Sequence, residues 1–597
     1  MPQKGLRRHL RDLLLLLLFR PHRLVVIGWW WLLGKKLRAR HRFSSAMAGL
    51  PIAHRLWMID SGQDDLRELA ALNARPAPIC VHLHIAREKA PVAVRRAATS
   101  VRRQSHAPVH VYVTREDEAQ PLPFAVWAGA TVLPGSHATR MAGLRAALAA
   151  ACQADAALLV PLDASSVMPR HALAAYAAQL SRRQAEGPVL LYGDQQVRAP
   201  LWSRVMPWFK PEWDPRMLWS QDYVSAACGL PVAAGLAAFE EDSAPQSVYE
   251  LVLRLVRDMS APGAEHVARI TALTGQGAWH ADGPERLAAV QRTLPPQAKA
   301  SPGPFGTVQV QYPLPRPAPK VSVIIATRDR VELLRTCVDG VLTGTDYPHI
   351  ELIIADNDSR DPETLRYMDE KAEDPRVQLV RWPHPFNYSA INNHAADFAT
   401  GEYLCLLNND IEVIERQWLG ELVREAARPG VGAVGARLLY PDRSIQHAGI
   451  AIGLGNAAGH AHRALPEGEP GYFAQALVAR GASAVTGACL LVAKSSFDAV
   501  GGLDEQTLAV AYNDVDLCLK LRERGLANIY TPAATLIHHE SKSRGLDFAP
   551  EQVERYMREL SVLQARWGTT EVVDPWHHPR LDRASEAYGM RGSLIGA

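Results

Sequence analysis

The sequence lacks long apolar runs and shows no excess of charge of one sign. Its two apolar N-terminal stretches, residues 13–19 and 24–34, are separated by the basic break 20–23. Both are far shorter than the roughly 20 residues that a membrane-spanning helix needs. A formal net charge of +3 over 597 residues gives no global reason to expect nucleic acid as a partner.

Cysteine is also scarce, and its spacing excludes the common cysteine motifs. No CxxC pair occurs, the number of cysteines is odd, and most of them lie within apolar runs. This pattern favours free buried thiols in a reducing cytoplasm over disulfides or a zinc site. The seven residues are Cys80, Cys152, Cys228, Cys337, Cys405, Cys489 and Cys518.

What the chain does have is the composition of a folded protein, with 48% hydrophobic and 21% charged residues. It is too long for one hydrophobic core, so at least two domains are expected. Residues 1–45 are set apart as a basic and apolar segment, in which Trp29, Trp30 and Trp31 precede a run of Lys and Arg. This pattern suits an anionic membrane surface, and an amphipathic helix docked on the protein's own core is the alternative. No small-residue cleavage site follows Gly34, which disfavours a signal peptide.

Residues 281–320 are rich in proline and poor in apolar periodicity, so the main domain boundary is expected in this linker. Beyond it, β-branched stretches at 321–325, 351–355 and 403–407 alternate with helical patterns, which is typical of an α/β sheet.

The first half repeats this plan weakly. Strand patterns at 79–83 and 109–113 lie about 30 residues apart, as the first two strands after the linker do, and 162–165, after the apolar stretch 157–160, matches 407–410 in position. Near the end of each half, the helical pattern 249–253 corresponds to 515–519. Two copies of one α/β domain are therefore predicted, at 75–280 and 321–548, followed by a C-terminal helix and tail at 549–597.

Polar residues follow three strands of the second copy. They are Thr327, Arg328, Asp329 and Arg330, then Asp356, Asn357 and Asp358, and finally Asn408, Asn409 and Asp410. Open α/β sheets bind ligands at the carboxyl ends of their strands. A single acidic residue there is often only a helix cap, but three clusters in one sheet favour a binding site.

These segments resemble family 2 glycosyltransferases, which have the GT-A fold. Residues 408–413 look like the metal-binding triplet of the family, 321–330 like its first strand and loop, and 353–361 like its nucleotide-contacting segment. Residues 387–401, 483–488, 501–505 and 513–516 match further family segments in the same order. The closest subgroup is that of bacterial O-antigen and surface-polysaccharide enzymes, rhamnosyltransferases among them.

The resemblance implies transfer of a sugar, with inversion, from a nucleotide-sugar to a hydroxyl of a glycan or lipid-linked glycan. A divalent cation, Mn²⁺ or Mg²⁺, would stabilise the departing diphosphate. Asp410 and His538 are the expected metal ligands, with His539 as the alternative histidine, and Asp514 is the expected general base. Asn408 departs from the usual acidic residue of the triplet, so the bound diphosphate would contribute more to metal affinity.

The remaining roles also follow from the resemblance. Donor contacts are expected from Thr327, Asp329, Arg330, Asp356, Asp358, Asn393, Asn408, Asn409, Lys542 and Arg544. Acceptor contacts are expected from Gly487, Ala488 and Asp516, and His447 and His460 either line the acceptor groove or belong to an ordinary loop.

The first copy lacks the same chemistry. Ser165 stands where the second copy has Asp410, and Val248 stands where it has Asp514, so this copy is expected to be non-catalytic. The predicted protein works at the cytoplasmic face of the inner membrane as a peripheral enzyme. The alternatives are a non-catalytic carbohydrate-binding scaffold and a bifunctional polymerase with both copies active.

Overall fold

The structure is a computed structural model, and contacts divide it into two units that are described separately. Unit 1 comprises Met1–Pro295, Ala300–Val308 and Gly589–Ala597, and unit 2 comprises Pro296–Lys299 and Gln309–Tyr588. The residues described are 2–34, 39, 42–43, 46–47, 50–72, 77–87, 90–118, 129–183, 187–198, 205–241, 243–258, 263–276, 283–539, 550–583, 586 and 588–590.

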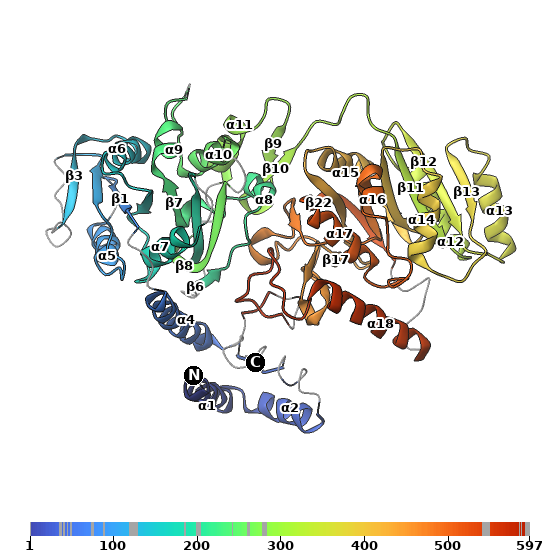
Figure 1. Cartoon of the computed structure of the whole chain (residues 1–597), viewed down its shortest axis with the longest axis horizontal. Helices are drawn as coiled ribbons and strands as arrows, with labels where there is room; N and C mark the ends of the chain where they lie inside the picture. The colour runs from blue at the N-terminus through green and yellow to red at the C-terminus, as the bar shows by residue number, and fades with distance from the viewer. Residues whose placement is uncertain are drawn as a thin grey trace. The chain divides into compact units, whose positions relative to one another are not determined.

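Unit 1 begins with the helices α1 (Pro2–Phe19), α2 (Pro21–Leu32) and α4 (Pro51–Ala71) (Figure 1). Within the described residues, no helix has both the length and the apolarity needed to cross a bilayer. Leu16 is fully buried beside Phe43 and Met47, whereas Leu18 and Trp31 are among several large apolar side chains of α1 and α2 that stay exposed. The N-terminal segment therefore packs only one part of its apolar surface.

The sheet of unit 1 has the strand order β3-β2-β1-β4-β7-β5-β6, and β8 pairs with β5. Its strands are β1 (Ile79–Ile85), β2 (Val111–Arg115), β3 (Ala130–Ser136), β4 (Leu158–Asp163), β5 (Leu190–Arg198), β6 (Val205–Trp208), β7 (Cys228–Pro231) and β8 (Ala264–Gln276). Its helices include α5 (Pro91–Arg102), α6 (Arg140–Gln153), α7 (Ala172–Arg182), α8 (Pro215–Ser220), α9 (Val232–Ala237), α10 (Val248–Asp258) and α11 (Gly283–Thr293).

The main sheet of unit 2 has the order β13-β12-β11-β14-β21-β16-β22-β15, with β17 on β16 and β20 on β22. The strands are β11 (Val321–Thr327), β12 (Ile350–Asp356), β13 (Val377–Arg381), β14 (Tyr403–Asn408), β15 (Ile411–Val413), β16 (Val431–Leu439), β17 (Ile445–His447), β20 (Arg480–Ala482), β21 (Cys489–Ala493) and β22 (Ala527–His538), beside a separate pair β18 (Ile450–Ile452) and β19 (Ala458–His460). The helices are α12 (Val331–Leu342), α13 (Pro362–Lys371), α14 (Tyr388–Asp397), α15 (Trp418–Ala426), α16 (Lys494–Ala499), α17 (Asn513–Glu523) and α18 (Pro550–Trp567).

The two sheets share one topology. Each sheet begins with four consecutive parallel strands, β3-β2-β1-β4 or β13-β12-β11-β14. An antiparallel strand, β7 or β21, follows, and a parallel pair, β5 with β8 or β16 with β22, comes next. The helix before the last long strand, α10 or α17, also corresponds. The predicted α/β fold with two similar sheets is confirmed.

The stretch 281–320 differs from the expected linker. It contains α11 and a two-stranded sheet of β9 (Lys299–Pro302) and β10 (Val308–Gln311). The division between the two units still falls inside this stretch. The helix was missed because its one proline, Pro284, stands at its first turn, where proline is tolerated, and the other prolines of the stretch follow its end. All seven cysteines are free, as predicted, and six are buried, whereas Cys152 is exposed.

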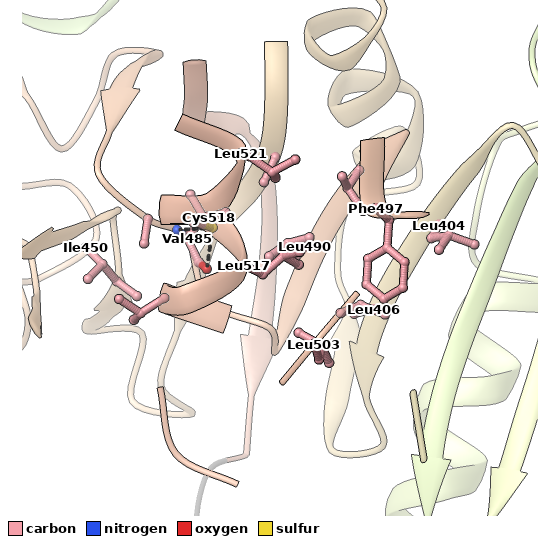
Figure 2. Packing of buried hydrophobic residues seen from close by; sticks show 14 of the residues in the cluster. Leu404, Leu406, Ile450, Val485, Leu490, Phe497, Leu503, Leu517, Cys518 and Leu521 are labelled. Atoms are coloured by element: carbon pink, nitrogen blue, oxygen red, sulfur yellow. Dashed lines mark hydrogen bonds between the residues drawn. The ribbon is translucent and has the colours of Figure 1, made fainter. Parts of the chain in front are cut away.

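The core of unit 2 lies on both faces of its sheet. On one face, Leu404 and Leu406 of β14 pack with Leu490 of β21 and with residues of α17 (Figure 2). The thiol of Cys518 in α17 lies 3.4 Å from the backbone nitrogen of Val485, so this helix is held against the loop that precedes β21. Burial of alternate strand residues on opposite faces fixes the register of the strand ends.

Asp516 anchors α17 to α18. Its carboxylate is fully buried and accepts hydrogen bonds from Arg566 at 2.7 Å and from the Trp567 indole at 2.9 Å, and Lys520 lies 3.0 Å away. The expected acceptor contact of Asp516 is therefore corrected, because every oxygen of this side chain faces protein cations rather than solvent. Asp516 therefore stabilises the packing of α17 against α18.

Unit 1 contains the same anchor. The buried carboxylate of Glu250 in α10 pairs with Arg254 at 2.6 Å and with Arg292 of α11 at 2.7 Å. Each unit therefore joins a helix to the following C-terminal helix through an acidic residue, a cation four residues on, and an arginine of the next helix. By this correspondence, α11 of unit 1 is the counterpart of α18 of unit 2.

We expect Asp516→Ala to destabilise unit 2 by about 2–4 kcal/mol, because it removes the buried partner of Lys520 and Trp567 and leaves Arg566 paired with Asp504 alone. Thermal unfolding followed by circular dichroism measures the loss. Asp498→Ala, which removes an exposed carboxylate 3.5 Å from Lys494, is the matched control and should stay within about 0.5 kcal/mol of the wild type. Equal melting temperatures for the two variants would contradict the anchoring role.

Candidate functional site

The three polar clusters meet at the carboxyl edge of the unit 2 sheet. Thr327 is the register partner of Asp356 across β11 and β12, and Ala326 is the partner of Asn408 across β11 and β14. Because these strands are parallel and adjacent, their ends open on the same side. The sequence-based prediction of one site at this edge therefore agrees with the register.

Asp356 and Asp329 shape the loops at the β11 and β12 end of this edge. Asp356 is buried, and its oxygens accept hydrogen bonds from the Ser359 amide at 3.1 Å and from Arg381 at 2.5 Å. Asp329 accepts the backbone amide of Arg360 at 2.7 Å. These carboxylates organise the backbone of two facing loops.

The same loops hold strained residues. The backbone φ angles of Asp329, Arg330 and Asp358 are 52°, 61° and 56°, a left-handed conformation that residues other than glycine rarely adopt. Arg330 and Asp358 are exposed and Thr327 is buried. Clustering of such strain is typical of ligand-binding loops.

Strand pairing brings His538 to Asp410 across 128 residues of sequence. Ile411 of β15 is the register partner of His538 at the end of β22. The Nε2 atom of His538 consequently lies 3.0 Å from a carboxylate oxygen of Asp410, and 3.3 Å from the side-chain amide of Asn408. Both Asp410 and His538 are buried. Asn409 instead donates to the Thr327 hydroxyl at 3.0 Å, which ties the triplet to β11.

The partner of the second ring nitrogen makes this pair a fitting cation site. The Nδ1 atom of His538 lies 2.8 Å from Oε1 of Gln446, and an amide oxygen can only accept, so Nδ1 carries the proton. The Nε2 atom then faces the anionic oxygen of Asp410 and the Asn408 amide, and either a second ring proton or a bound cation would place positive charge beside the carboxylate. His539, by contrast, pairs with Glu412 at 2.8 Å.

Asp514 stands at the start of α17 and accepts the backbone amide of Gly487 at 2.8 Å. Burial raises the pKa of its carboxyl, and the hydrogen bonds from Gly487 and Val515 partly oppose that rise. The side chain is half-buried and lines a cavity of about 410 Å³. Other residues that line this cavity are Tyr388, Asn408, Ile450, His460, Thr486, Gly487, Ala488, Tyr512 and Tyr556.

Asn408 of the expected metal triplet and the expected base Asp514 therefore line one cavity, whereas Asp410 and His538 are not among its lining residues. Tyr388 joins the two sides, since its hydroxyl lies 3.3 Å from the Asn408 side-chain oxygen and 3.0 Å from the Gly487 carbonyl. Gly487 and Ala488 also line this cavity, and their contact with an acceptor stays a prediction.

The histidines of the acceptor groove form a directed pair. His447 accepts the Gly449 amide on Nε2 at 3.3 Å, so its Nδ1 carries the proton and donates to Nδ1 of His460 at 3.0 Å. His460 lines the cavity, whereas His447 is fully buried behind it, and burial holds its pKa well below the usual value.

Two of the predicted donor contacts change. Asn393 brackets a loop, because it donates to the Leu503 carbonyl at 2.8 Å and accepts the Leu503 amide at 2.9 Å; its side chain is committed to that loop, which corrects the donor role. Lys542 and Arg544 lie outside the described residues. Sequence reasoning missed Tyr388 and Gln446 as site residues: Tyr388 lay within a motif already noted, whereas nothing in the sequence marks Gln446.

Unit 1 keeps the strand end but not the ligands. Asp163 ends β4, and its carboxylate accepts the backbone amide of Ser165 at 2.7 Å and lies 3.7 Å from Arg140. The acidic side chain is thus used to close its own turn. Val248 begins α10, and Asp514 stands in the corresponding first turn of α17 in unit 2.

Comparison with known proteins finds a family match within unit 2. Residues 322–465 match the family described as Glycosyl transferase family 2. An uncharacterized protein, y4gI of Sinorhizobium fredii (strain NBRC 101917 / NGR234), is 38% identical over 408 residues, which cover 66% of this chain and 45% of that protein.

Two relatives carry functional names. The O-antigen biosynthesis protein RfbC of Myxococcus xanthus is 36% identical over 466 residues, 74% of this chain and 35% of that protein. An N-acetylglucosaminyl-diphospho-decaprenol L-rhamnosyltransferase of Mycobacterium tuberculosis (strain CDC 1551 / Oshkosh) is 34% identical over 110 residues, 18% of this chain and 32% of that protein. The chain thus spans less than half the length of each relative, and within unit 2 residues 322–465 are similar to family 2 glycosyltransferases.

Proposed function

We propose that unit 2 is an inverting, metal-dependent glycosyltransferase that transfers a sugar from a nucleotide-sugar to a hydroxyl of a glycan or lipid-linked glycan. The observation that carries this proposal is the single cavity lined by both Asn408 of the metal triplet and Asp514. A donor diphosphate beside Asn408 and an acceptor hydroxyl beside Asp514 would share that cavity. One displacement with one base inverts the anomeric carbon.

Asp514 suits the role of general base. Its raised pKa makes it a stronger base than an ordinary aspartate, and the Gly487 amide fixes the orientation of the carboxylate. Tyr512 and Tyr556, whose hydroxyls lie 2.6 Å apart, line the same cavity and present a surface on which an acceptor sugar ring can rest.

Asp410 and His538 suit the role of metal ligands, with Gln446 setting the histidine tautomer. A divalent cation, Mn²⁺ or Mg²⁺, supplies positive charge that stabilises the leaving diphosphate when bound. Asn408 adds no negative charge, so the diphosphate itself would complete the binding of the metal. Asp356 and Asp329 organise the loops expected to contact the nucleotide, and Thr327 and Asn409 fix the floor of the site.

The names of two relatives support a proposal for the biological setting. RfbC is named for O-antigen biosynthesis, and the mycobacterial enzyme is named for a diphospho-decaprenol acceptor. We propose an acceptor of that kind in cell-surface polysaccharide synthesis, at the cytoplasmic face of the inner membrane. The exposed apolar side chains of α1 and α2, including Leu18, Trp29 and Trp31, support peripheral contact with that surface.

The two alternatives are less well supported. A non-catalytic scaffold would have no use for a half-buried carboxylate with a raised pKa facing the same cavity as a metal triplet. A bifunctional polymerase would require chemistry in unit 1, where Asp163 closes its own turn and Ser165 replaces the metal carboxylate.

Asp514→Asn should lower the transfer rate by at least about 10²-fold while donor binding is kept, because only the base is lost. Release of nucleoside diphosphate measures the rate, and isothermal titration measures donor affinity. In the wild type, the acid limb of kcat/KM should lie above the ordinary aspartate pKa of 3.8, since the base must be deprotonated and burial raises its pKa.

The thermal stability of Asp514→Asn tests whether Asp514 acts as a base or as a carboxylate that stabilises the fold. A folded-state pKa above the unfolded value means that the charged form destabilises the fold, a cost fully present at pH 7 and lost as the pH falls through the raised pKa. Asp514→Asn should therefore melt no lower than the wild type at pH 7. A large drop in melting temperature together with full turnover would remove Asp514 from the base role.

His538→Ala should weaken Mn²⁺ binding by at least about tenfold and lower turnover at limiting metal, because an electron-pair donor is lost. His539→Ala, one residue away and paired with Glu412, is the matched control and should bind Mn²⁺ as the wild type does. Electron paramagnetic resonance of free Mn²⁺ reports binding directly. Equal loss in both variants, or loss in neither, would contradict the assignment.

Ser165→Ala should leave turnover unchanged within about twofold, because unit 1 lacks a metal carboxylate and a base at the corresponding positions. Steady-state rates with saturating donor and acceptor are the measurement. A loss of the size expected for Asp514→Asn would instead support two active units.

A further inference from the structure

Unit 1 contains a cavity of about 720 Å³, larger than the one beside Asp514. We call it the α4–α5 groove, because α4 and α5 form its two walls. Its apolar lining includes Met58, Ile59, Leu66, Val92, Met168 and Leu273. A volume of this size holds a ligand of several hundred daltons or one end of a longer chain.

Both walls are held in place by buried polar contacts. On the α4 side, Asp65 is buried and forms an ion pair with Arg269 of β8, and it also lies 3.6 Å from His171. On the α5 side, the Ser100 hydroxyl accepts the Met168 amide at 3.1 Å, and Gln104 donates to the Pro169 carbonyl at 2.8 Å. The groove is therefore part of the fold of unit 1.

The rim of the groove is basic. Arg95, Arg96 and Arg103 line it from α5 and its C-terminal end, and Arg170 lines it from the loop after β4. All are exposed, and none forms an ion pair with another residue in the described part of the chain. Asp65, the acidic residue that lines the groove, is already neutralised by Arg269. The net charge around the opening is thus strongly positive.

This charge is not inherited from the duplicated fold. The helix of unit 2 that corresponds to α5 is α12, which follows the first strand of its sheet and carries Glu332 and Asp339 beside Arg335. Arg335 is paired with Glu363 at 3.3 Å. Helix α5 has no acidic residue, so its arginines are a property of unit 1 alone.

An apolar groove rimmed by arginines matches a ligand that has an anionic group beside an apolar chain. Guanidinium groups bind phosphate oxygens in bidentate pairs, and the apolar lining gains from covering a hydrocarbon chain. A free phosphate would leave the apolar surface bare, and a neutral glycan would leave the arginines unpaired.

We propose that the α4–α5 groove binds the lipid diphosphate of a lipid-linked acceptor. This rests on the proposed function for the nature of the acceptor and assigns unit 1 a task although it lacks catalytic groups. Holding the lipid raises the effective concentration of its glycan for the catalytic unit of the same chain. The groove then governs KM for lipid-linked acceptors and leaves donor chemistry unaffected.

The test is titration of the full-length protein with farnesyl diphosphate, a water-soluble prenyl diphosphate, in the presence of chelator. We expect measurable binding that weakens at least about tenfold in the double variant Arg96→Glu/Arg103→Glu, because two guanidinium partners are reversed in charge. Ile59→Gln, in the exposed apolar lining, should weaken binding of farnesyl diphosphate but not of inorganic diphosphate.

Two controls keep the outcome unambiguous. Arg182→Glu makes the same charge change at an exposed site of unit 1 away from the groove and should bind as the wild type does. His538→Ala should also keep farnesyl diphosphate binding, which excludes binding at the catalytic diphosphate site. Absence of wild-type binding, equal binding by the double variant, or loss in His538→Ala would overturn the proposal.

Donor hydrolysis distinguishes a failure of the groove proposal from a failure of the catalytic proposal. Donor hydrolysis to nucleoside diphosphate should be the same in the wild type and the groove variants, whereas KM for a prenyl-diphosphate-linked acceptor should rise at least about tenfold in the double variant. If donor turnover is absent in every protein while farnesyl diphosphate binds, the groove stands and the function of unit 2 does not.

Discussion

The contact on which the site depends is the approach of His538 to Asp410, 3.0 Å apart. Two groups that both offer electron pairs are held together by the antiparallel pairing of β15 with β22, and Gln446 fixes which ring nitrogen faces the carboxylate. A positive charge between them, from a second ring proton or from a bound cation, stabilises this arrangement. The fold thus places a histidine nitrogen beside a carboxylate, two groups of the kind that bind divalent cations in proteins.

The duplicated architecture separates what the fold needs from what the reaction needs. Glu250 and Asp516 occupy equivalent places in α10 and α17, and both are buried among cations that join two helices. That contact survives in both units because losing it would cost the fold. The carboxylates expected to bind the metal and to act as the base occur in unit 2 only, since a strand end and a helix start form equally well with Ser165 and Val248.

This distinction also explains how far the sequence could predict the site. Strand ends at Thr327, Asp356 and Asn408 were predictable, because apolar strand patterns fix where each polar cluster begins and parallel strands bring the clusters together. Asp516 and Asn393 were assigned to ligands wrongly. A buried polar residue that secures a helix or loop has the same residue type, and sits in the same motif, as one that meets a substrate.

What decides between the two uses is the direction in which the side chain points, and a one-residue step along α17 or α14 changes it by about 100°. Asp514 and Asp516 lie two positions apart, so one lines the cavity while the other faces α18. The position of Asp514 carries a cost that Asp516 avoids, because no cationic side chain among the described residues pairs with it and burial raises its pKa. A structural carboxylate would have acquired a partner like Lys520; a base cannot, since a paired carboxylate would lose the proton affinity that its task requires.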